Sequence, residues 1–263
     1  MNYDKIDLVM WTLNGEETLP FCLQSIEEAI SSEVVNQKIV VDGNSIDNTK
    51  RICQSFGWKV YHAKVTGITY QANQALNMVK TDLFASFEQD ILLNPHWLPL
   101  IMRHFNDENV AVAQGVRVST HPTLRKIEEY SLTKMLRYSS LDNTMYRTEI
   151  IKKLGGYNHQ YPLSADRDLQ DRILNSGYKW IVDRQLISDH LKTSVRDSAK
   201  KIYNDLVICK YTKDKVKFRI ILSIFAFSPI RGLQTAIKTK CPEAILVYPY
   251  LRLQRVLAYF KCL

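Results

Sequence analysis

Two acidic side chains stand directly after a short apolar run, Leu83 to Phe87, in the tripeptide Glu88-Gln89-Asp90. Carboxylate oxygens at such a place can hold a hard cation, which can neutralise negative charge on a ligand. We therefore predict a site for Mn²⁺ or Mg²⁺, with Asp90 as its first ligand and Glu88 as a further candidate. A solvated acidic loop ahead of Asn94 is the simpler alternative.

A second pair of carboxylates, Asp166 and Asp168, lies at the start of a predicted acidic helix over residues 164–175. Two positions apart on a helix, they point to different faces and need not share a role. One well-placed carboxylate is enough to take the proton of an attacking hydroxyl group. The alternative is that both only place favourable negative charge at a helix N-terminus.

Polar residues also follow two earlier apolar runs, in the segments Trp11-Thr12-Leu13-Asn14 and Asp42-Gly43-Asn44-Ser45. Ligands of open α/β sheets gather at the carboxyl ends of the strands. We therefore expect these segments and Glu88-Gln89-Asp90 to meet at one edge of a sheet.

The first half of the chain alternates short β-rich runs with helical patterns, which predicts βαβ units in a mostly parallel sheet flanked by helices. The predicted strands are 6–11, 38–42, 58–61, 83–87 and 110–116, and the predicted helices between them are 16–31, 46–56 and 68–79. Beyond Val118 we predict a helix over 124–138, a short strand near Met145, a turn at Gly155-Gly156 and a strand over 180–182, which a short turn separates from His190.

The net charge of +8 is concentrated at the C-terminal end. Residues 1–200 hold 23 Lys/Arg and 24 Asp/Glu, whereas residues 201–263 hold 12 and 3, a net charge of +9. The basic part is helical in pattern, and apolar residues are interleaved with its cations. This composition suits a helix that binds a membrane surface or a partner.

With 46% hydrophobic and 24% charged residues, the composition is that of a globular protein and excludes a disordered or collagen-like chain. The five cysteines are widely spaced and odd in number, which argues against a zinc cluster or a disulfide framework and for reduced thiols in the cytosol. There is no signal-peptide pattern, and the longest apolar run, 220–230, is about half of the ~20 residues that span a bilayer. We expect a cytoplasmic protein, with peripheral attachment to the inner face of the membrane as an option.

Taken in order, these segments resemble the motifs of family 2 inverting glycosyltransferases of the GT-A fold. That family's Pro-Thr-Tyr-Asn-like turn is similar to Trp11–Asn14, and its Asp-Asp-Gly-Ser-x-Asp-x-Thr motif is similar to Asp42–Thr49. Its metal-binding Asp-x-Asp is similar to Glu88-Gln89-Asp90, and its acidic catalytic motif resembles Asp166–Arg172. The resemblance covers residues 5–192 and implies a Rossmann-like GT-A domain over 1–192, with a nucleotide-sugar half (1–118), an acceptor half (119–192) and a basic helical extension (193–263).

The resemblance also implies a role for each matching residue. Asp166 would be the catalytic base, and Asp90, Glu88 and His190 would form the metal set. The nucleotide set would be Trp11, Thr12, Leu13, Asp42, Gly67, Asn73, Glu88 and Gln89, and the acceptor set Gly156, Tyr157 and Asp168.

Some of these roles have simpler alternatives. In the family, the aspartate at the position of Asp42 accepts a hydrogen bond from the nucleotide base, but a turn cap is the alternative role. His190 could instead be structural, and Asn73 could lie on an ordinary helix surface. The sequence departs from the family where Leu13 replaces a tyrosine, Ala72 an arginine and Ala165 a glutamate.

The function implied is inverting transfer from a nucleotide-sugar, with a UDP-sugar favoured, to a glycan or lipid-linked acceptor. A polyprenyl-phosphate sugar synthase is the alternative within the enzymes, because an anionic phosphate acceptor needs no strong base. A non-enzymatic protein that binds nucleic acid or membrane through the basic tail is the other alternative. The sequence resembles no nucleic-acid module, so nucleic acid is not an expected partner. The donor sugar, the acceptor and the oligomeric state are not readable from the sequence.

Overall fold

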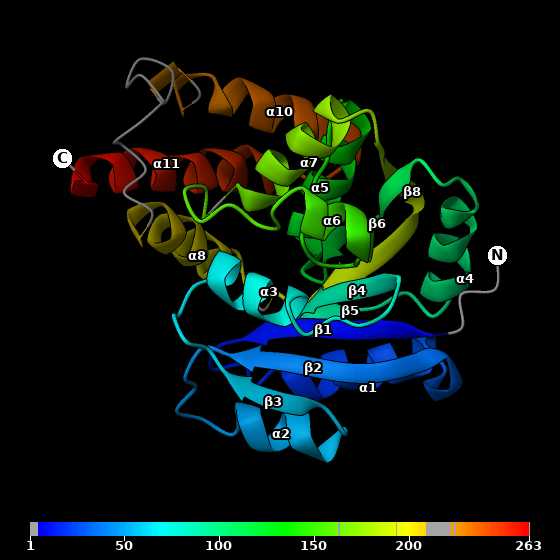
Figure 1. Cartoon of the computed structure of the whole chain (residues 1–263). Helices are drawn as coiled ribbons and strands as arrows, with labels where there is room; N and C mark the ends of the chain where they lie inside the picture. Colours follow the sequence, from blue (N-terminus) through cyan, green and yellow to red (C-terminus); the bar gives the residue numbers. More distant parts are fainter. Residues whose placement is uncertain (1–4, 163, 193, 209–221, 224, 263) are drawn as a thin grey trace. The chain divides into compact units, whose positions relative to one another are not determined.

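The computed structural model describes residues 5–162, 164–192, 194–208, 222–223 and 225–262 (Figure 1). The chain forms two compact units. Unit 1 comprises residues 1–117 and 137–190, and unit 2 comprises residues 118–136 and 191–263. All predicted catalytic, nucleotide, metal and acceptor residues belong to unit 1.

Unit 1 is built on an eight-stranded sheet with the strand order β3-β2-β1-β4-β7-β6-β8-β5. Strands β1 to β4 pair in parallel, β7 is antiparallel to both β4 and β6, and β5 is antiparallel to β8. The strands are β1 (Ile6–Thr12), β2 (Val35–Asp42), β3 (Lys59–His62), β4 (Leu83–Glu88), β5 (Ile91–Leu92), β6 (Val110–Ser119), β7 (Thr144–Arg147) and β8 (Lys179–His190).

Helices cover both faces of this sheet. They are α1 (Leu19–Ala29), α2 (Thr49–Ser55), α3 (Ile68–Leu76), α4 (Trp97–Met102), α6 (Thr148–Lys153) and α7 (Ala165–Asn175), with short 3-10 turns at Ser32–Val34 and Arg103–Asn106. All seven residues of β1 are buried, as a strand covered on both faces requires.

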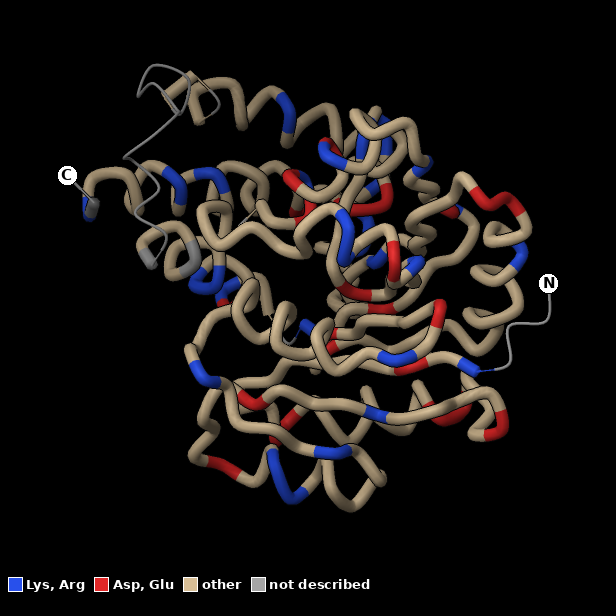
Figure 2. The backbone as a smooth tube through the Cα atoms, in the orientation of Figure 1, with Lys and Arg blue, Asp and Glu red and all other residues tan. Residues whose placement is uncertain are grey.

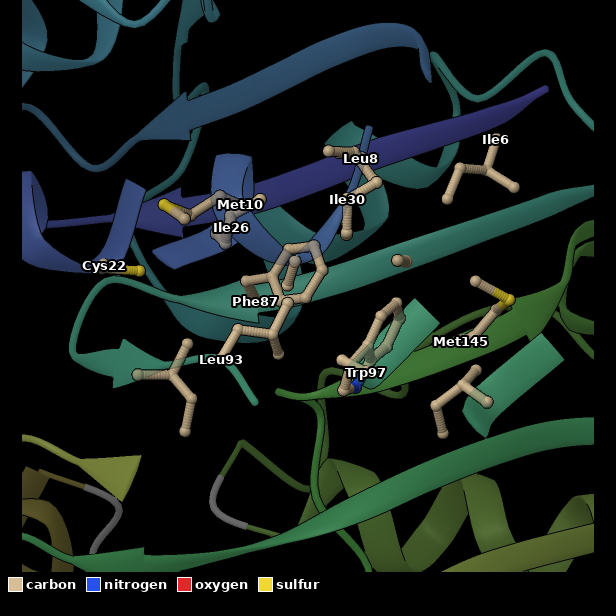
Figure 3. Packing of buried hydrophobic residues seen from close by; sticks show 14 of the residues in the cluster. Ile6, Leu8, Met10, Cys22, Ile26, Ile30, Phe87, Leu93, Trp97 and Met145 are labelled. Carbon is tan, nitrogen blue, oxygen red and sulfur yellow. The ribbon is translucent and has the colours of Figure 1, made fainter. Parts of the chain in front are cut away.

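Alternate residues of β1 enter two separate cores. Leu8 and Met10 pack with α1, α2 and α4, in the cluster seen around Phe87 and Trp97 in Figure 3. Val9 and Trp11 pack on the other face with α3, α6 and α7. The period-two alternation of a strand thus fixes which face each helix covers.

The predicted α/β fold is confirmed, and each of the five strands predicted in the first half is present within a few residues. The prediction was wrong about β8, which continues without a turn from Lys179 to His190. The antiparallel pairing of β7 with β4 and β6 was also not anticipated.

Unit 2 is helical. Its helices are α5 (Pro122–Lys134), α8 (Val195–Ile208), α10 (Ser228–Thr239) and α11 (Ala244–Cys262). Ile127 of α5, Ala236 of α10 and Ala244 of α11 form a small buried core. In the part of the chain that the structure describes, no helix is both long and apolar enough to cross a bilayer. Residues 220, 221 and 224 of the predicted apolar run 220–230 lie outside the described residues.

Candidate active site

Three predicted strand ends meet at one edge of the unit 1 sheet. Thr12 at the end of β1 pairs with Asp42 at the end of β2. On the other side of β1, Trp11 pairs with Glu88 at the end of β4. Parallel strands bring their carboxyl ends to the same edge, which is why segments far apart in the sequence assemble here.

Asp42 is fully buried. Its Oδ1 accepts hydrogen bonds from Thr12 Oγ1 at 3.1 Å and Ser45 Oγ at 2.5 Å, and its Oδ2 accepts one from the Ser45 backbone N–H at 2.9 Å. These bonds provide the turn-cap role that was the alternative for this residue. Recognition of a nucleotide base by Asp42 stays a prediction.

The turn after β1 is held by the side chain of Gln89. Its Oε1 accepts from the Leu13 backbone N–H at 2.9 Å, and its Nε2 donates to the Leu13 carbonyl at 3.1 Å. A Cβ at Gly15 would lie 2.6 Å from this carboxamide, so a larger residue there would displace the Gln89 side chain from Leu13. Leu13 is 45% exposed and Trp11 only 5%, so the Trp11 indole offers little surface to a base.

Asp90 and His190 lie against each other. The antiparallel pairing of β5 with β8 sets Ile91 opposite His190, and this register brings the preceding residue, Asp90, next to the imidazole. His190 Nε2 is 2.9 Å from Asp90 Oδ2. The side chain of His190 is 6% exposed and that of Asp90 is 20% exposed, so the pair is accessible mainly through the carboxylate.

Glu88, the other predicted metal ligand, has a different neighbour. Its Oε2 accepts a hydrogen bond from Arg117 Nη1 at 2.9 Å, and the same nitrogen is bonded to Asp142. Burial acts to lower the pKa of the Arg117 guanidinium, but the charges of Asp142 and Glu88 outweigh it and hold that pKa well above its usual value. Arg117 is therefore a permanent cation between two carboxylates.

Asp166, the predicted base, is the second residue of α7. Its Oδ2 accepts a hydrogen bond from Ser139 Oγ at 3.0 Å. Burial raises the pKa of its carboxyl group, while hydrogen bonds from the Arg167 backbone and from Ser139 oppose the rise. The Arg117 charge also acts on it, in the lowering direction.

The segment 139–142 links the two acidic regions of unit 1. Ser139 bonds Asp166, and Ser140 Oγ donates to Asp142, the partner of Arg117. Sequence reasoning missed Arg117, Asp142 and both serines. The available signal was a lone arginine directly after the predicted strand 110–116, because a cation at the acidic edge of a sheet needs a charge partner.

The predicted acceptor residues form one hydrogen-bonded cluster. Asp168 is paired at 2.8 Å with Arg172, whose guanidinium also donates to the Gly156 carbonyl at 2.7 Å. Asn73 donates to the Tyr157 carbonyl at 2.7 Å and accepts from the Tyr157 backbone N–H at 2.8 Å.

This cluster limits what its members can offer a ligand. The Tyr157 side chain is buried, so any contact it makes with an acceptor would be through its backbone. Asn73 binds the loop of the acceptor half, and its predicted contact with a nucleotide stays a prediction. Gly67, at a φ of 143°, precedes α3 and donates its N–H to Gln71 Oε1 at 3.2 Å.

No cluster of three or more His, Cys, Asp or Glu side chains arranged to hold a metal ion occurs among the described residues. The chain itself offers a pair, the Asp90 carboxylate and the His190 imidazole.

Residues 7–168, more than half of the chain, match the model of glycosyl transferase family 2. The chain belongs to this family. It is accordingly a glycosyltransferase, and the predicted family is confirmed. A search of the curated proteins finds no match.

Several solved structures share the fold of this glycosyltransferase. A mannosyltransferase, PcManGT from Pyrobaculum calidifontis in complex with GDP-Man and Mn²⁺, is 14% identical with a TM-score of 0.62, over 94% of this chain and 73% of that one. TarS residues 1–349 from S. aureus in complex with UDP are 15% identical with a TM-score of 0.57, over 97% and 89%. Glucosyl-3-phosphoglycerate synthase from Mycobacterium tuberculosis, with Mn²⁺, UDP and glucosyl-3-phosphoglycerate, is 16% identical with a TM-score of 0.54, over 73% and 74%.

Proposed function

We propose that this family 2 glycosyltransferase transfers a sugar with inversion from a nucleotide-sugar, with a UDP-sugar favoured, to a glycan or lipid-linked acceptor. The observation that carries the proposal is the pair of separate carboxylate centres in unit 1. One is Asp90 with His190 at the strand ends, and the other is Asp166 with Ser139 at the start of α7. Donor binding and acceptor activation are separate tasks, which two such centres can divide between them.

The first centre fits a divalent cation. One carboxylate and one imidazole are ligands that Mn²⁺ accepts, and Mg²⁺ is commonly bound by one or two carboxylates together with substrate phosphates. A pair of ligands on the chain is therefore sufficient when a diphosphate supplies the others. The cation would neutralise charge on the leaving diphosphate. Fold-sharing complexes that contain Mn²⁺ with UDP or GDP-Man support this assignment.

The second centre suits a general base. Inverting transfer requires removal of the acceptor hydroxyl proton as the oxygen attacks the anomeric carbon opposite the leaving group. A carboxylate with a raised pKa is the stronger base, and burial raises the pKa of Asp166. Its position at the N-terminus of α7 keeps the ionised form accessible, because a helix N-terminus favours negative charge.

Arg117 would connect the two centres. It holds Glu88 at the strand end and Asp142 in the segment 139–142, and Ser139 of that segment donates a hydrogen bond to Asp166. We infer that Glu88 acts at the donor side as a fixed acceptor of hydrogen bonds, with Asp90 and His190 as the metal ligands.

The test is calorimetric titration of the protein with UDP, GDP and their sugars, each with and without Mn²⁺. We expect one nucleotide to bind in a metal-dependent way. Absence of any such binding, together with retardation of single-stranded oligonucleotides in a gel without metal, would favour the non-enzymatic alternative.

The acceptor class is tested separately with Asp166→Asn. A near-complete loss of transfer supports activation of a hydroxyl acceptor, whereas a mild loss supports a polyprenyl-phosphate acceptor, whose phosphate is already ionised. A lipid-linked acceptor would place the enzyme at the cytoplasmic face of the membrane as a peripheral protein. The net charge of +9 over residues 201–263 supports that placement.

A further inference from the structure

Helix α10 of unit 2 has one face packed and one face open. The packed face is made of small residues, and Gly232, Thr235 and Ala236 are buried. A Cβ at Gly232 would lie 2.9 Å from the carbonyl oxygen of Ala244, so α10 and α11 meet at close backbone distance. The face of α10 that carries the small residues is therefore buried by packing inside unit 2.

The open face is apolar. Phe227, Ile230, Leu233 and Ile237 are 59%, 55%, 49% and 67% exposed. At about 100° per residue, these four side chains fall within a sector of about 120° around the helix axis. The exposed Gln234 falls within the same sector, so the stripe is predominantly apolar. A stripe of this kind marks an interaction surface, unlike single apolar residues scattered over a surface.

Cations border this stripe. Arg231 and Lys238 are exposed and lie on the side of the helix between the apolar stripe and the packed face. Further Lys and Arg residues are distributed along α11, as the blue segments of Figure 2 show. The arrangement of an apolar stripe edged by Lys and Arg is that of a helix lying in a membrane interface.

The positive charge beside this face distinguishes between two possible occupants, a second copy of the chain and an anionic bilayer. A second copy of the chain would set like charges against each other, because each copy carries the exposed Arg231 and Lys238 beside this stripe. An anionic bilayer complements both the apolar stripe and the positive charge. The observations therefore favour the bilayer.

We propose that α10 is the membrane-docking element of this enzyme. The helix lies in the plane of an anionic bilayer, with Ile230, Leu233 and Ile237 at the boundary of the acyl chains and Arg231 and Lys238 among the headgroups. This proposal rests on the proposed function in one respect only: a lipid-linked acceptor would explain why the enzyme is at the membrane. The docking itself involves no nucleotide.

Sedimentation with vesicles tests the docking. The whole 263-residue chain is mixed with vesicles of phosphatidylcholine alone or of phosphatidylcholine with phosphatidylglycerol, without nucleotide. We expect it to sediment with the anionic vesicles and to remain largely in the supernatant with the neutral ones. Ile230→Gln with Ile237→Gln should lower the partition coefficient by about tenfold or more, because two buried side chains are lost.

The matched control is Phe21→Gln with Leu174→Gln, which removes two exposed apolar side chains of unit 1, 60% and 42% exposed. This control should bind vesicles like the parent protein. Thermal melting of both double variants checks that each is folded. Because no nucleotide is present, failure of vesicle binding is distinguishable from failure of nucleotide binding.

The charges are tested by Arg231→Gln with Lys238→Gln. Each cation near an anionic surface contributes about fivefold to partitioning, so we expect a loss of about 25-fold at low salt and a smaller loss at high salt. The proposal is overturned if the protein ignores anionic vesicles, or if the Ile230/Ile237 variant binds as well as the control. A third result also overturns it: the protein does not bind vesicles but forms a dimer, and the Ile230/Ile237 variant dissociates that dimer.

Discussion

His190 Nε2 lies 2.9 Å from Asp90 Oδ2, and the two residues are 100 positions apart in the sequence. The short pairing of β5 with β8 creates this proximity by setting Ile91 opposite His190. A histidine at the end of a long strand and a carboxylate in the turn before a short one thus lie together as candidate metal ligands. Neither residue could hold a cation firmly alone, because divalent cations require several ligands.

We predict that His190→Ala weakens Mn²⁺ binding in the presence of UDP by about 10–100-fold, the range typical for loss of a residue that supports a metal site. The measurement is calorimetric titration of Mn²⁺ into the protein saturated with UDP. His104→Ala is the matched control, because His104 Nε2 is 3.0 Å from Asp183 Oδ2 in an equivalent pair elsewhere in unit 1. Equal Mn²⁺ affinity in the two variants would remove His190 from the metal site.

Asp166→Asn should lower kcat by about 10²–10⁴-fold while UDP affinity stays unchanged, because the amide cannot accept the acceptor proton. The measurement is steady-state kinetics together with UDP titration. Asp171→Asn changes a carboxylate on the same helix that pairs with Arg137 at the surface, and it should leave kcat within about twofold. A comparable loss in both variants would point to a general effect on α7.

The pH dependence of the transfer activity should reflect the raised pKa of Asp166. The base acts in its ionised form, so activity falls as the pH drops through this pKa, at a higher pH than for an ordinary aspartate. Ser139→Ala removes a hydrogen bond that lowers this pKa and should move the acidic limb to still higher pH. An unchanged limb in Ser139→Ala would assign the limb to another group.

The same shift has a consequence for stability. A folded-state pKa above the unfolded value gives a stabilising contribution that is full below the unfolded pKa and is lost as the pH rises through the folded pKa. At neutral pH the ionised Asp166 therefore costs stability. We predict that Asp166→Asn melts at the same or a higher temperature than the parent at pH 7, measured by calorimetry. A clear decrease would mean that the carboxylate stabilises the fold.

Arg117→Met should destabilise the protein by roughly 3 kcal/mol, because it leaves the Asp142 carboxylate, 1% exposed, without its cation. The free energy of unfolding is measured by urea denaturation at pH 7. The control is Arg137→Met, which breaks the surface pair with Asp171, 42% and 50% exposed, and should cost less than about 1 kcal/mol. Adding Asp142→Asn to Arg117→Met should restore part of the loss, and no recovery would contradict the pairing argument.

The parts of the fold that follow local rules were predictable. The apolar run at Leu83–Phe87 and its acidic end identified both β4 and its place at the ligand edge of the sheet. β8 was underestimated because its exposed and buried residues alternate irregularly along Lys179–His190, so only 180–182 read as strand.

The site was predictable only where the type of a single residue and its position in the sequence indicate a chemical role. Asp90 and Asp166 stood out as carboxylates at element ends. Their environments depend on the pairing of distant segments, which no local pattern encodes. Arg117 occupies the strand end beside Glu88 and Asp142, and Asn73 holds the loop at Tyr157.

Gly156 provides a test of that loop. Its φ is 67°, and a Cβ there would collide with Asn73 Oδ1. Gly156→Ala should therefore cost about 1 kcal/mol for the left-handed backbone plus a further 1–3 kcal/mol for displacing Asn73 from Tyr157. Gly177→Ala is the control, because Gly177 has a similar φ of 82° with open space around its Cβ position and should cost only the backbone part. Urea unfolding of the two variants gives the difference directly. Equal losses of unfolding free energy in the two variants would mean that Asn73 does not fix the loop. The difference between the variants should shrink when Asn73→Ala is added to Gly156→Ala, since the colliding atom is then gone.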